Sequence, residues 1–234
     1  MKMVYEYLIG VIILGFFWIL LYFKNKNLRR EMIFGGILYS SVIIPLVLLT
    51  KFLSNFIKIS WIWIPDYYNP KELFDLGLKI GGGIEDILFI FFAGGIITIF
   101  YEALYKREPT KSHIKGHLLS IIGFIISYLI IAVSFNFNII YNLVISSLVG
   151  FIIIIIQRKD LIKHSLKGAV AFTIFYFLFM VFYSVLFPNS VNTYWTLKNI
   201  SGILVFNVPI EEFLYSISFG LMWAPMYEYV KGIR

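Results

Sequence analysis

The sequence predicts an all-α integral membrane protein with about seven transmembrane helices. Hydrophobic residues make up 60% of the 234 residues and charged residues only 14%, which is outside the usual range of soluble domains. Long apolar stretches recur along the chain, and most basic residues fall in the segments between them. The two-residue alternation of barrel strands is missing, so we expect the chain to cross the bilayer as helices.

A helix needs roughly 20 apolar residues to cross about 30 Å of hydrocarbon. The stretches that meet this requirement cover approximately residues 5–23, 32–53, 84–104, 117–133, 138–156, 168–187 and 208–229. The first stretch carries Glu6 and lacks a small-residue cleavage site, so we interpret it as a retained helix rather than a signal peptide. Pro225 interrupts the last stretch and predicts a kink there.

Basic residues set the predicted orientation. Of the 20 lysines and arginines, 14 follow the first, third, fifth and seventh stretches: Lys24, Lys26, Arg29, Arg30, Lys106, Arg107, Lys111, Lys115, Arg158, Lys159, Lys163, Lys167, Lys231 and Arg234. Because cytoplasmic loops are enriched in lysine and arginine, we expect the N-terminus outside and the C-terminus in the cytoplasm. We expect these side chains to contact lipid head groups and predict no nucleic-acid site.

Acidic pairs open the third and the seventh stretch, and they indicate an internal repeat. A shift of 126 residues places Glu85 on Glu211 and Asp86 on Glu212. The same shift aligns Gly94 with Gly220, Tyr101 with Tyr227 and Glu102 with Glu228. We therefore expect two parallel three-helix repeats, residues 1–107 and 138–234, joined by a linker helix within residues 108–137.

The acidic pairs have two interpretations. Pro209 suits the first turn of a helix, where the dipole and unpaired amides favour negative charge, so the acids that follow it could simply cap the helix. Against this, the apolar run 200–206 indicates that the chain already lies in the bilayer, where acids are costly and usually functional. Their repetition favours the functional interpretation. The catalytic candidates are Glu85, Asp86, Glu211 and Glu212.

Neighbouring positions on a helix diverge by about 100°, so the two acids of one pair should face different surroundings. We expect one to face the interface between the repeats and the other to meet backbone amides or a polar neighbour. If Glu211 faces Glu85 across that interface, like charge and a low dielectric would keep one of them protonated. Such an acid can donate a proton to a weak base, and its ionised partner can accept one.

Aromatic residues reach 19% of the chain. Those in the sixth stretch follow helical spacing, which is typical of packing but also suits the wall of a pocket, where aromatic faces stabilise a carbocation. The candidate substrate-binding residues are Pro209, Phe213, Tyr215, Phe89, Tyr176, Phe179 and Tyr183. Further aromatic segments, 61–68 and 194–195, precede the two acidic pairs and suit an interfacial belt.

Several sites are not predicted. No dinucleotide or ATP motif occurs, so we expect no cofactor, and aspartate-rich diphosphate motifs are missing. Cysteine is absent, which excludes thiolate ligands. His113 and His117 lie in a basic segment without an acidic third ligand, and we place His164 in the next loop, so we predict no metal site. We expect Glu102 and Glu228 to anchor helix ends or to pair with neighbouring basic residues: Lys106, Arg107 or Lys231.

The segment 208–215 resembles the Pro-x-Glu-Glu signature of the membrane-embedded lycopene cyclase family, found in heterodimeric bacterial and fused archaeal enzymes. The duplicated layout is also similar to that family. The resemblance implies a redox-neutral cyclisation of linear carotenoid ends, started by a protein acid and finished by a base. Glu211 and Glu212 match the signature, whereas Gly83 and Asp86 replace its proline and second glutamate in the first copy.

Two other classes of protein remain compatible with the sequence. Parallel repeats with buried acids also describe transport sites, so a small proton-coupled carrier is the main alternative. A non-catalytic membrane subunit related to the cyclases is the other. The aromatic excess and the scarcity of polar residues within the stretches favour a cyclase over a carrier. We expect a multi-pass protein of a prokaryotic cytoplasmic membrane.

Overall fold

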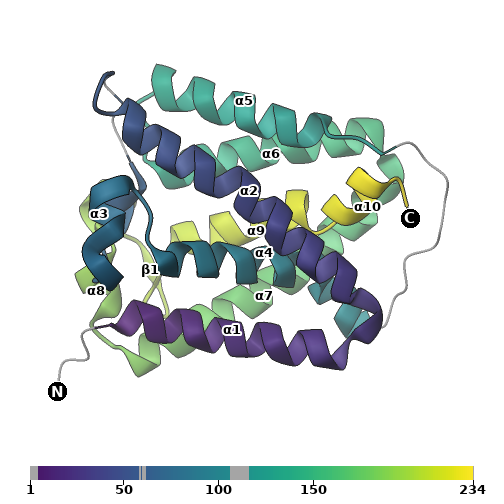
Figure 1. Ribbon diagram of the computed structural model, residues 1–234, viewed down its shortest axis with the longest axis horizontal. Helices are drawn as coiled ribbons and strands as arrows, with labels where there is room; N and C mark the ends of the chain where they lie inside the picture. Colours follow the sequence, from purple (N-terminus) through teal and green to yellow (C-terminus); the bar gives the residue numbers. More distant parts are fainter. Residues whose placement is uncertain (1–4, 58, 60–61, 106–115, 234) are drawn as a thin grey trace.

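The long helices of this computed structural model lie side by side along the long axis of the molecule (Figure 1). The structure describes residues 5–57, 59, 62–105 and 116–233. The longer helices are α1 (Glu6–Lys24), α2 (Arg29–Leu53), α4 (Ile84–Tyr105), α5 (Leu119–Ser134), α6 (Ile139–Gln157), α7 (Ile162–Leu186) and α9 (Ile210–Trp223). Short elements complete the described chain: α3 (Leu76–Ile80), α8 (Ser190–Tyr194), α10 (Met226–Lys231), β1 (Leu204–Val205) and β2 (Val208–Pro209).

Among the described residues, five helices are long and apolar enough to cross a membrane: α1, α2 with its leading turn, α4, α6 and α7 with its leading turn. The structure is therefore consistent with the predicted all-α membrane protein. The predicted fourth stretch forms α5, a shorter apolar helix of 16 residues. The predicted seventh stretch is divided into α9 and α10 at Pro225, which confirms the expected break, because proline cannot donate the hydrogen bond that would continue the helix.

The start of α7 differs from the sequence prediction. The helix begins at Ile162, six residues before the apolar stretch. Its first turns bury His164 and Ser165 and leave Lys163 and Lys167 exposed, so one helical face is buried although the local sequence is polar. A hydropathy window averages both faces and misses such a turn.

The two helices that begin with acidic pairs lie in the middle of the bundle. Helix α4 packs against α1, α2 and α7, and α9 packs against α6 and α7. Glycines allow the close approach: a Cβ atom at Gly94 would meet the side chain of Tyr39, and one at Gly220 would meet the backbone of Ala169. Both acidic helix starts therefore stand among neighbouring helices.

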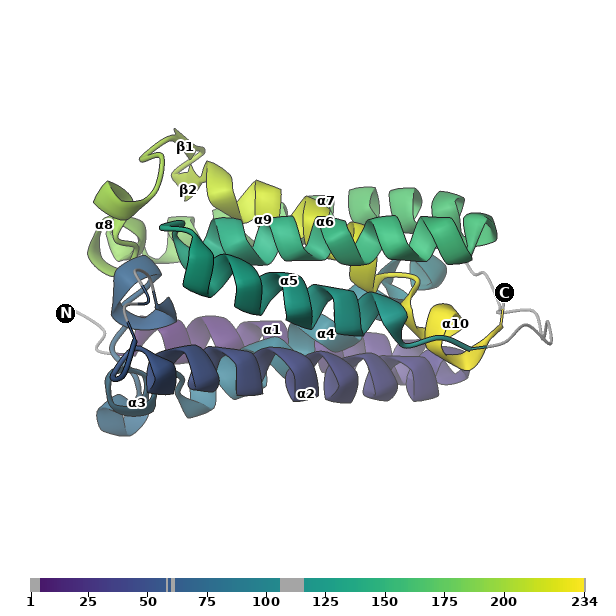
Figure 2. The same cartoon turned by 90° about the horizontal axis from the view of Figure 1, so that it is seen from above.

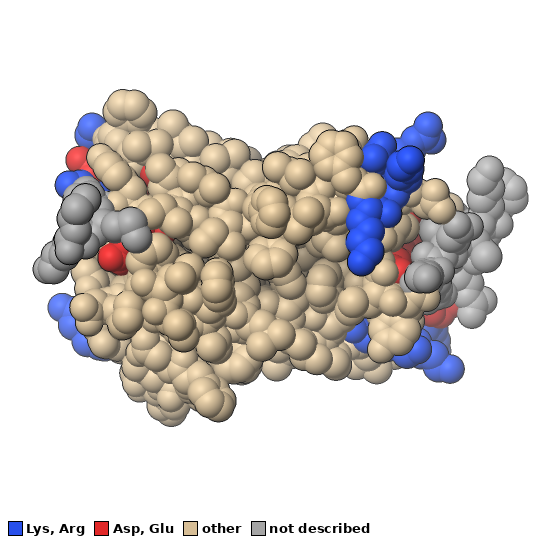
Figure 3. All heavy atoms as spheres, turned by 90° about the horizontal axis from the view of Figure 1, so that it is seen from below, with Lys and Arg blue, Asp and Glu red and all other residues tan. Residues whose placement is uncertain are grey.

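The outer surface of the bundle is apolar over its middle and charged at its ends. Figure 3 shows lysine and arginine side chains at the two ends of the molecule with a belt of other residues between them. Ile12, Phe16 and Leu178 are among the exposed large hydrophobic residues on the helices. Such a belt is suited to contact with lipid tails.

The loops over the acidic ends of α4 and α9 contact one another. Figure 2 shows α3, α8 and the β1–β2 hairpin at one end of the molecule, opposite the C-terminus. Tyr68 pairs with Trp195 in a β-bridge, and the Asn69 amide donates to the Tyr194 carbonyl at 2.8 Å. Backbone hydrogen bonds thus join two loops that are far apart in the sequence, next to the acidic pairs.

Candidate functional site

All four acids of the two pairs are buried, with at most 5% of any side chain exposed. Glu85 and Asp86 lie in the first turn of α4, and Glu211 and Glu212 lie in the first turn of α9. Burial on this scale requires hydrogen-bond partners, because an unpaired buried carboxylate is very costly. The partners separate the four acids into two kinds.

Glu212 accepts hydrogen bonds from three aromatic side chains. The Tyr67 hydroxyl donates to Oε1 at 2.5 Å, the Trp195 indole Nε1 donates to Oε1 at 2.8 Å, and the Tyr176 hydroxyl donates to Oε2 at 2.7 Å. Burial, followed by the charge of Glu212, raises the pKa of Tyr67 well above its usual range, so this hydroxyl stays a donor. Three donors on one carboxyl suit its ionised form.

Asp86 has a different environment, which includes a second acid. Its Oδ1 accepts from the Tyr7 hydroxyl at 2.8 Å, and its Oδ2 accepts from the Gly83 amide at 2.8 Å. The buried side chain of Glu72, from the loop before α3, interacts with Asp86. Burial, followed by the charge of Asp86, raises the pKa of Glu72 to about 9. Glu72 therefore retains its proton at neutral pH, beside the Asp86 carboxyl group.

The first acid of each pair binds the loop that leads into its own helix. Glu85 accepts from the Leu73 amide at 2.8 Å. Glu211 accepts from the Ser201 amide at 2.8 Å and from the Tyr141 hydroxyl at 2.7 Å. The expected divergence of neighbouring acids is confirmed. Glu85 and Glu211 accept hydrogen bonds from different partners and not from each other, so the two acids lie in separate sites rather than facing one another.

Two adjacent cavities adjoin the second acid of each pair. The Glu212 cavity, of about 570 Å³, also contacts Tyr7 and Tyr176. The Asp86 cavity, of about 660 Å³, reaches α2 and is lined almost entirely by apolar side chains. Residues that line both cavities are Trp63, Phe89 and Tyr215. Predominantly apolar and aromatic walls with a few polar groups are common in small-molecule sites.

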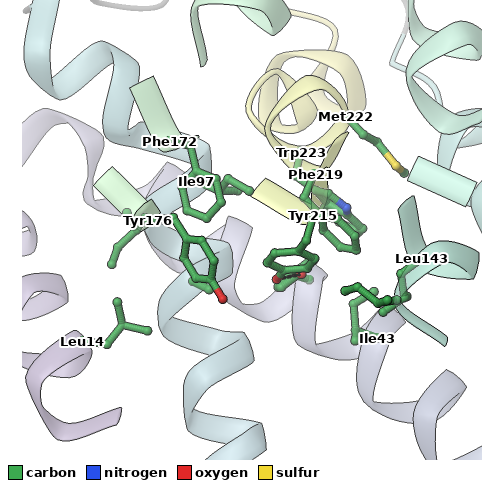
Figure 4. Packing of buried hydrophobic residues seen from close by; sticks show 14 of the residues in the cluster. Leu14, Ile43, Ile97, Leu143, Phe172, Tyr176, Tyr215, Phe219, Met222 and Trp223 are labelled. Atoms are coloured by element: carbon green, nitrogen blue, oxygen red, sulfur yellow. Dashed lines mark hydrogen bonds between the residues drawn. The ribbon is translucent and has the colours of Figure 1, made fainter. Parts of the chain in front are cut away.

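Most of the predicted substrate-binding residues line the Glu212 cavity: Phe89, Tyr176, Phe179, Tyr183 and Tyr215. Figure 4 shows Tyr176 of α7 and Tyr215 of α9 beside one another, and their ring centroids are 5.6 Å apart. Phe213 instead packs on Phe177, because one step along the helix turns it away from Glu212. Pro209 lies in β2, paired with Leu204, and immediately precedes α9.

Several site residues escaped the sequence analysis: Tyr7, Tyr67, Glu72, Tyr141 and Trp195. Tyr67 and Trp195 lie in the aromatic segments, which were interpreted only as an interfacial belt, and Glu72 lies in the loop after the first of these segments. The sequence feature that could have indicated these residues is the position of an aromatic loop directly before each acidic pair. Tyr7 and Tyr141 lie on other helices, and nothing in their local sequence separates them from packing tyrosines.

A second group of titratable residues lies far from these cavities. His164 Nδ1 is 3.0 Å from Glu228 Oε1, and His164 Nε2 is 3.3 Å from Glu102 Oε1. All three are buried. His164 thus lies in a helix rather than in a loop, and it is a partner that the sequence analysis did not foresee for both glutamates. Lys106, Arg107 and His113 lie outside the described residues.

The fold and the site define a class of protein: a helical membrane protein with apolar, aromatic-walled cavities that contain separately bound carboxyl groups. The chain belongs to the lycopene cyclase family, whose profile matches residues 5–104 and 138–230. Comparison with curated proteins and with solved structures gave no match. Membership of this family indicates a cyclase of the carotenoid type.

Proposed function

We propose that the protein cyclises the linear ends of lycopene or a related carotenoid by adding a proton and removing another. One observation carries the proposal. Two adjacent apolar cavities adjoin two carboxyl groups, one of which interacts with a second buried acid while the other accepts from three donors. That combination supplies an acid and a base within a space suited to a hydrocarbon.

The Glu72–Asp86 pair is the proposed proton donor. Asp86 lines a cavity, whereas Glu72 stands behind it and keeps the pair protonated at neutral pH. When the proton moves to a terminal alkene carbon, Tyr7 and the Gly83 amide stabilise the Asp86 carboxylate that remains. Asp86 is therefore the catalytic group of this pair, and Glu72 is a positioning residue that holds the proton.

Glu212 is the proposed base. Protonation of the terminal alkene leaves a tertiary carbocation, the next alkene attacks it, and a carbon–carbon bond closes the ring. Glu212 then removes a proton from the ring carbon beside the new cation. One proton enters and one leaves, so no oxidant or reductant is needed. The faces of Tyr176, Tyr215 and Phe89 surround this space and stabilise the intermediate cations.

Glu85 and Glu211 are proposed to act through position rather than contact with substrate. Each fixes the backbone of a loop against the start of its helix. For Glu211, the loop includes the approach to the β1–β2 hairpin, which sets where α9 begins. Pro209, immediately before α9, and Phe213, which packs on Phe177 of α7, have the same supporting role.

We also propose that the chain is a tandem repeat. Helices α1 and α6 each have 19 residues, α2 and α7 each have 25, and a three-residue turn precedes each of the longer pair. The family profile matches two segments and leaves residues 105–137, with α5, between them. These facts support the division into residues 1–107, a linker at 108–137, and residues 138–234.

The experiment that tests the function is expression in lycopene-accumulating cells, followed by pigment analysis. Cyclised carotenoid of the same mass as lycopene is expected. When isolated membranes that contain preformed lycopene are incubated in D₂O, each new ring should contain one deuterium from the solvent. Unchanged lycopene, with the folded protein verified in the membrane, would reject the proposal and favour a carrier or a non-catalytic relative.

The pH dependence of the reaction follows from Glu72. Its pKa in the folded chain, about 9, exceeds the usual value of 4.5, so the folded state holds this proton through neutral pH. The contribution of Glu72 to the free energy of unfolding is fully present below about pH 4.5 and is lost as the pH rises through about 9. Cyclisation in isolated membranes should fall over the upper part of that range, reversibly. A rate that stays constant to pH 10.5 or so would contradict the shared proton.

Substrate should reach the Asp86 cavity from the lipid. Ile80 and Ile87 line this cavity, and each is about half exposed on the surface of the bundle. Ile87→Trp should narrow this opening and lower the rate several-fold, with the larger effect at low substrate concentration. Ile12→Trp, at an exposed position on α1 away from the cavities, is the matched control and should be neutral. Equal effects of both variants would contradict the proposal that substrate enters through this opening.

The orientation across the membrane is a further proposal, in which the end with the acidic pairs faces outside. Because the chain contains no cysteine, any introduced thiol is unique. Asn189→Cys, before α8, should react with an impermeant maleimide added to intact cells, whereas Lys26→Cys should react only after lysis. The reverse pattern would invert the assignment. Both sites are exposed, so accessibility of the folded chain does not limit labelling. This orientation supports placement in the cytoplasmic membrane of a prokaryote.

A further inference from the structure

Glu102, His164 and Glu228 form a buried cluster at the end of the bundle opposite the acidic pairs. Each offers one ligand atom, and these atoms lie within 4.8 Å of one another. Glu102 is close to the end of α4, His164 lies in the first turn of α7, and Glu228 lies in α10. From Glu85 to Glu102 a straight helix rises about 25 Å, so the cluster is separate from the proposed cyclase site.

Glu31 is a fourth buried acid close enough to interact electrostatically with Glu228. It is 3% exposed, and its Oε2 atom is buried without a hydrogen-bond partner. Glu31 is the third residue of α2, as His164 is the third residue of α7. Four helices, α2, α4, α7 and α10, therefore each contribute one buried ligand-type side chain to this region.

Buried oxygen atoms of the group have capacity for a ligand. The Oε2 atom of Glu228 is buried without a hydrogen-bond partner, as is the Oε2 atom of Glu31. A buried polar atom without a partner is costly, because it has lost its water. A divalent cation bound to these oxygens would supply the interaction.

We propose that Glu31, Glu102, His164 and Glu228 bind one divalent first-row transition-metal ion of the zinc type. A nitrogen donor with carboxylate oxygens suits Zn²⁺, whereas Mg²⁺ and Ca²⁺ prefer oxygen donors alone. Ligand atoms of a tetrahedral zinc site stand about 3.4 Å apart, given bonds of about 2.1 Å. His164 offers one ring nitrogen to an ion: Nδ1 and Glu228 Oε1, 3.0 Å apart, need only a small shift, whereas Glu102 Oε1 lies against the other nitrogen and must turn toward the ion.

The ion would have a structural role, because it would join α2, α4, α7 and α10 at a point where the two proposed repeats meet. The inference does not depend on the cyclase reaction. Loss of the metal site would leave the proposed Glu72–Asp86 donor and the Glu212 base unaltered in position. The two proposals can therefore fail separately.

The test is metal binding by the purified full chain in detergent. After treatment with a chelator, the wild type should take up one Zn²⁺ per chain, retain it through gel filtration, and ignore Mg²⁺. Co²⁺ in its place should give the visible absorption of a tetrahedral site. Zinc should also raise the unfolding temperature, because a ligand that binds only the folded state stabilises that state.

Variants separate a built site from surface binding. His164→Gln and Glu228→Gln should lose stoichiometric zinc, and Glu31→Gln should weaken binding roughly 10–100-fold. His117→Gln is the matched histidine control near the same end of the molecule and should bind like the wild type. A wild type that retains no zinc would overturn the proposal, as would equal zinc in the His164→Gln chain. If His164→Gln fails to fold, the zinc affinity of Glu31→Gln tests the proposal, and an affinity equal to that of the wild type would overturn it.

Discussion

Glu212→Gln is expected to lower the rate of cyclisation by about 10²–10⁴-fold, the usual contribution of a general acid or base. Glutamine has nearly the same shape and can still accept from Tyr67 and Trp195, while its amide can donate to the Tyr176 oxygen. The fold around α9 should therefore survive. What is lost is the negative charge, and with it both proton removal and stabilisation of the nearby carbocation.

Glu211→Gln is the matched control for this variant, because it makes the same change one residue earlier in the same buried helical turn. Glu211 binds the Ser201 amide and Tyr141, not the cavity, so its loss should be clearly smaller and should affect substrate binding and folding more than turnover. Asp75→Asn, at an exposed left-handed position that asparagine tolerates, should be neutral. If Glu211→Gln is as inactive as Glu212→Gln, the assigned roles are wrong. Pigment analysis with membrane-protein quantification measures all three.

Much of the fold was accessible from the sequence because hydrocarbon imposes one length and one composition on every crossing helix. The bounds of α1, α4 and α6 follow their apolar stretches within one or two residues. The start of α7 did not, because there a polar sequence with one buried face continues the helix past the apolar stretch. The division between α9 and α10 was predictable because Pro225 has a fixed local effect.

The site was accessible only in part. Spacing along one helix predicted that Glu211 and Glu212 would diverge, but it gave no means of deciding which one meets the cavity. That choice depends on tertiary contacts: Trp195 reaches Glu212 from one loop and Tyr67 from another, and the two loops are fastened together by backbone hydrogen bonds. Glu72 was missed for the same reason, since a lone acid in a loop looks solvated until packing buries it.

The weaker first motif has a structural explanation. Asp86 is one methylene shorter than the glutamate at the equivalent position, and it is capped by the amide of Gly83 three residues earlier. A proline at position 83 would have no amide hydrogen to give. The glycine and the aspartate therefore belong together, and they leave room for Glu72 beside Asp86: a Cβ atom at position 83 would come within 2.8 Å of the Glu72 carboxyl carbon.

The second large effect is expected for Asp86→Asn, which should also lower cyclisation by about 10²–10⁴-fold. Asparagine keeps an acceptor for Tyr7 but carries no proton to transfer, and its amide faces the Gly83 amide, donor against donor. The lost cap should cost about 1 kcal/mol of stability, which is small beside the rate effect. Tyr7→Phe leaves the acid in place and should be only mildly impaired.

Glu72→Gln gives the decisive comparison, because the proposed donor is a pair that shares one proton. Each single variant should remove the transferable proton, so the double variant Glu72→Gln/Asp86→Asn should be no slower than either one. Two residues with independent roles would instead show losses that multiply. Multiplying losses in the double variant would reject the shared-proton donor and leave Asp86 to act alone.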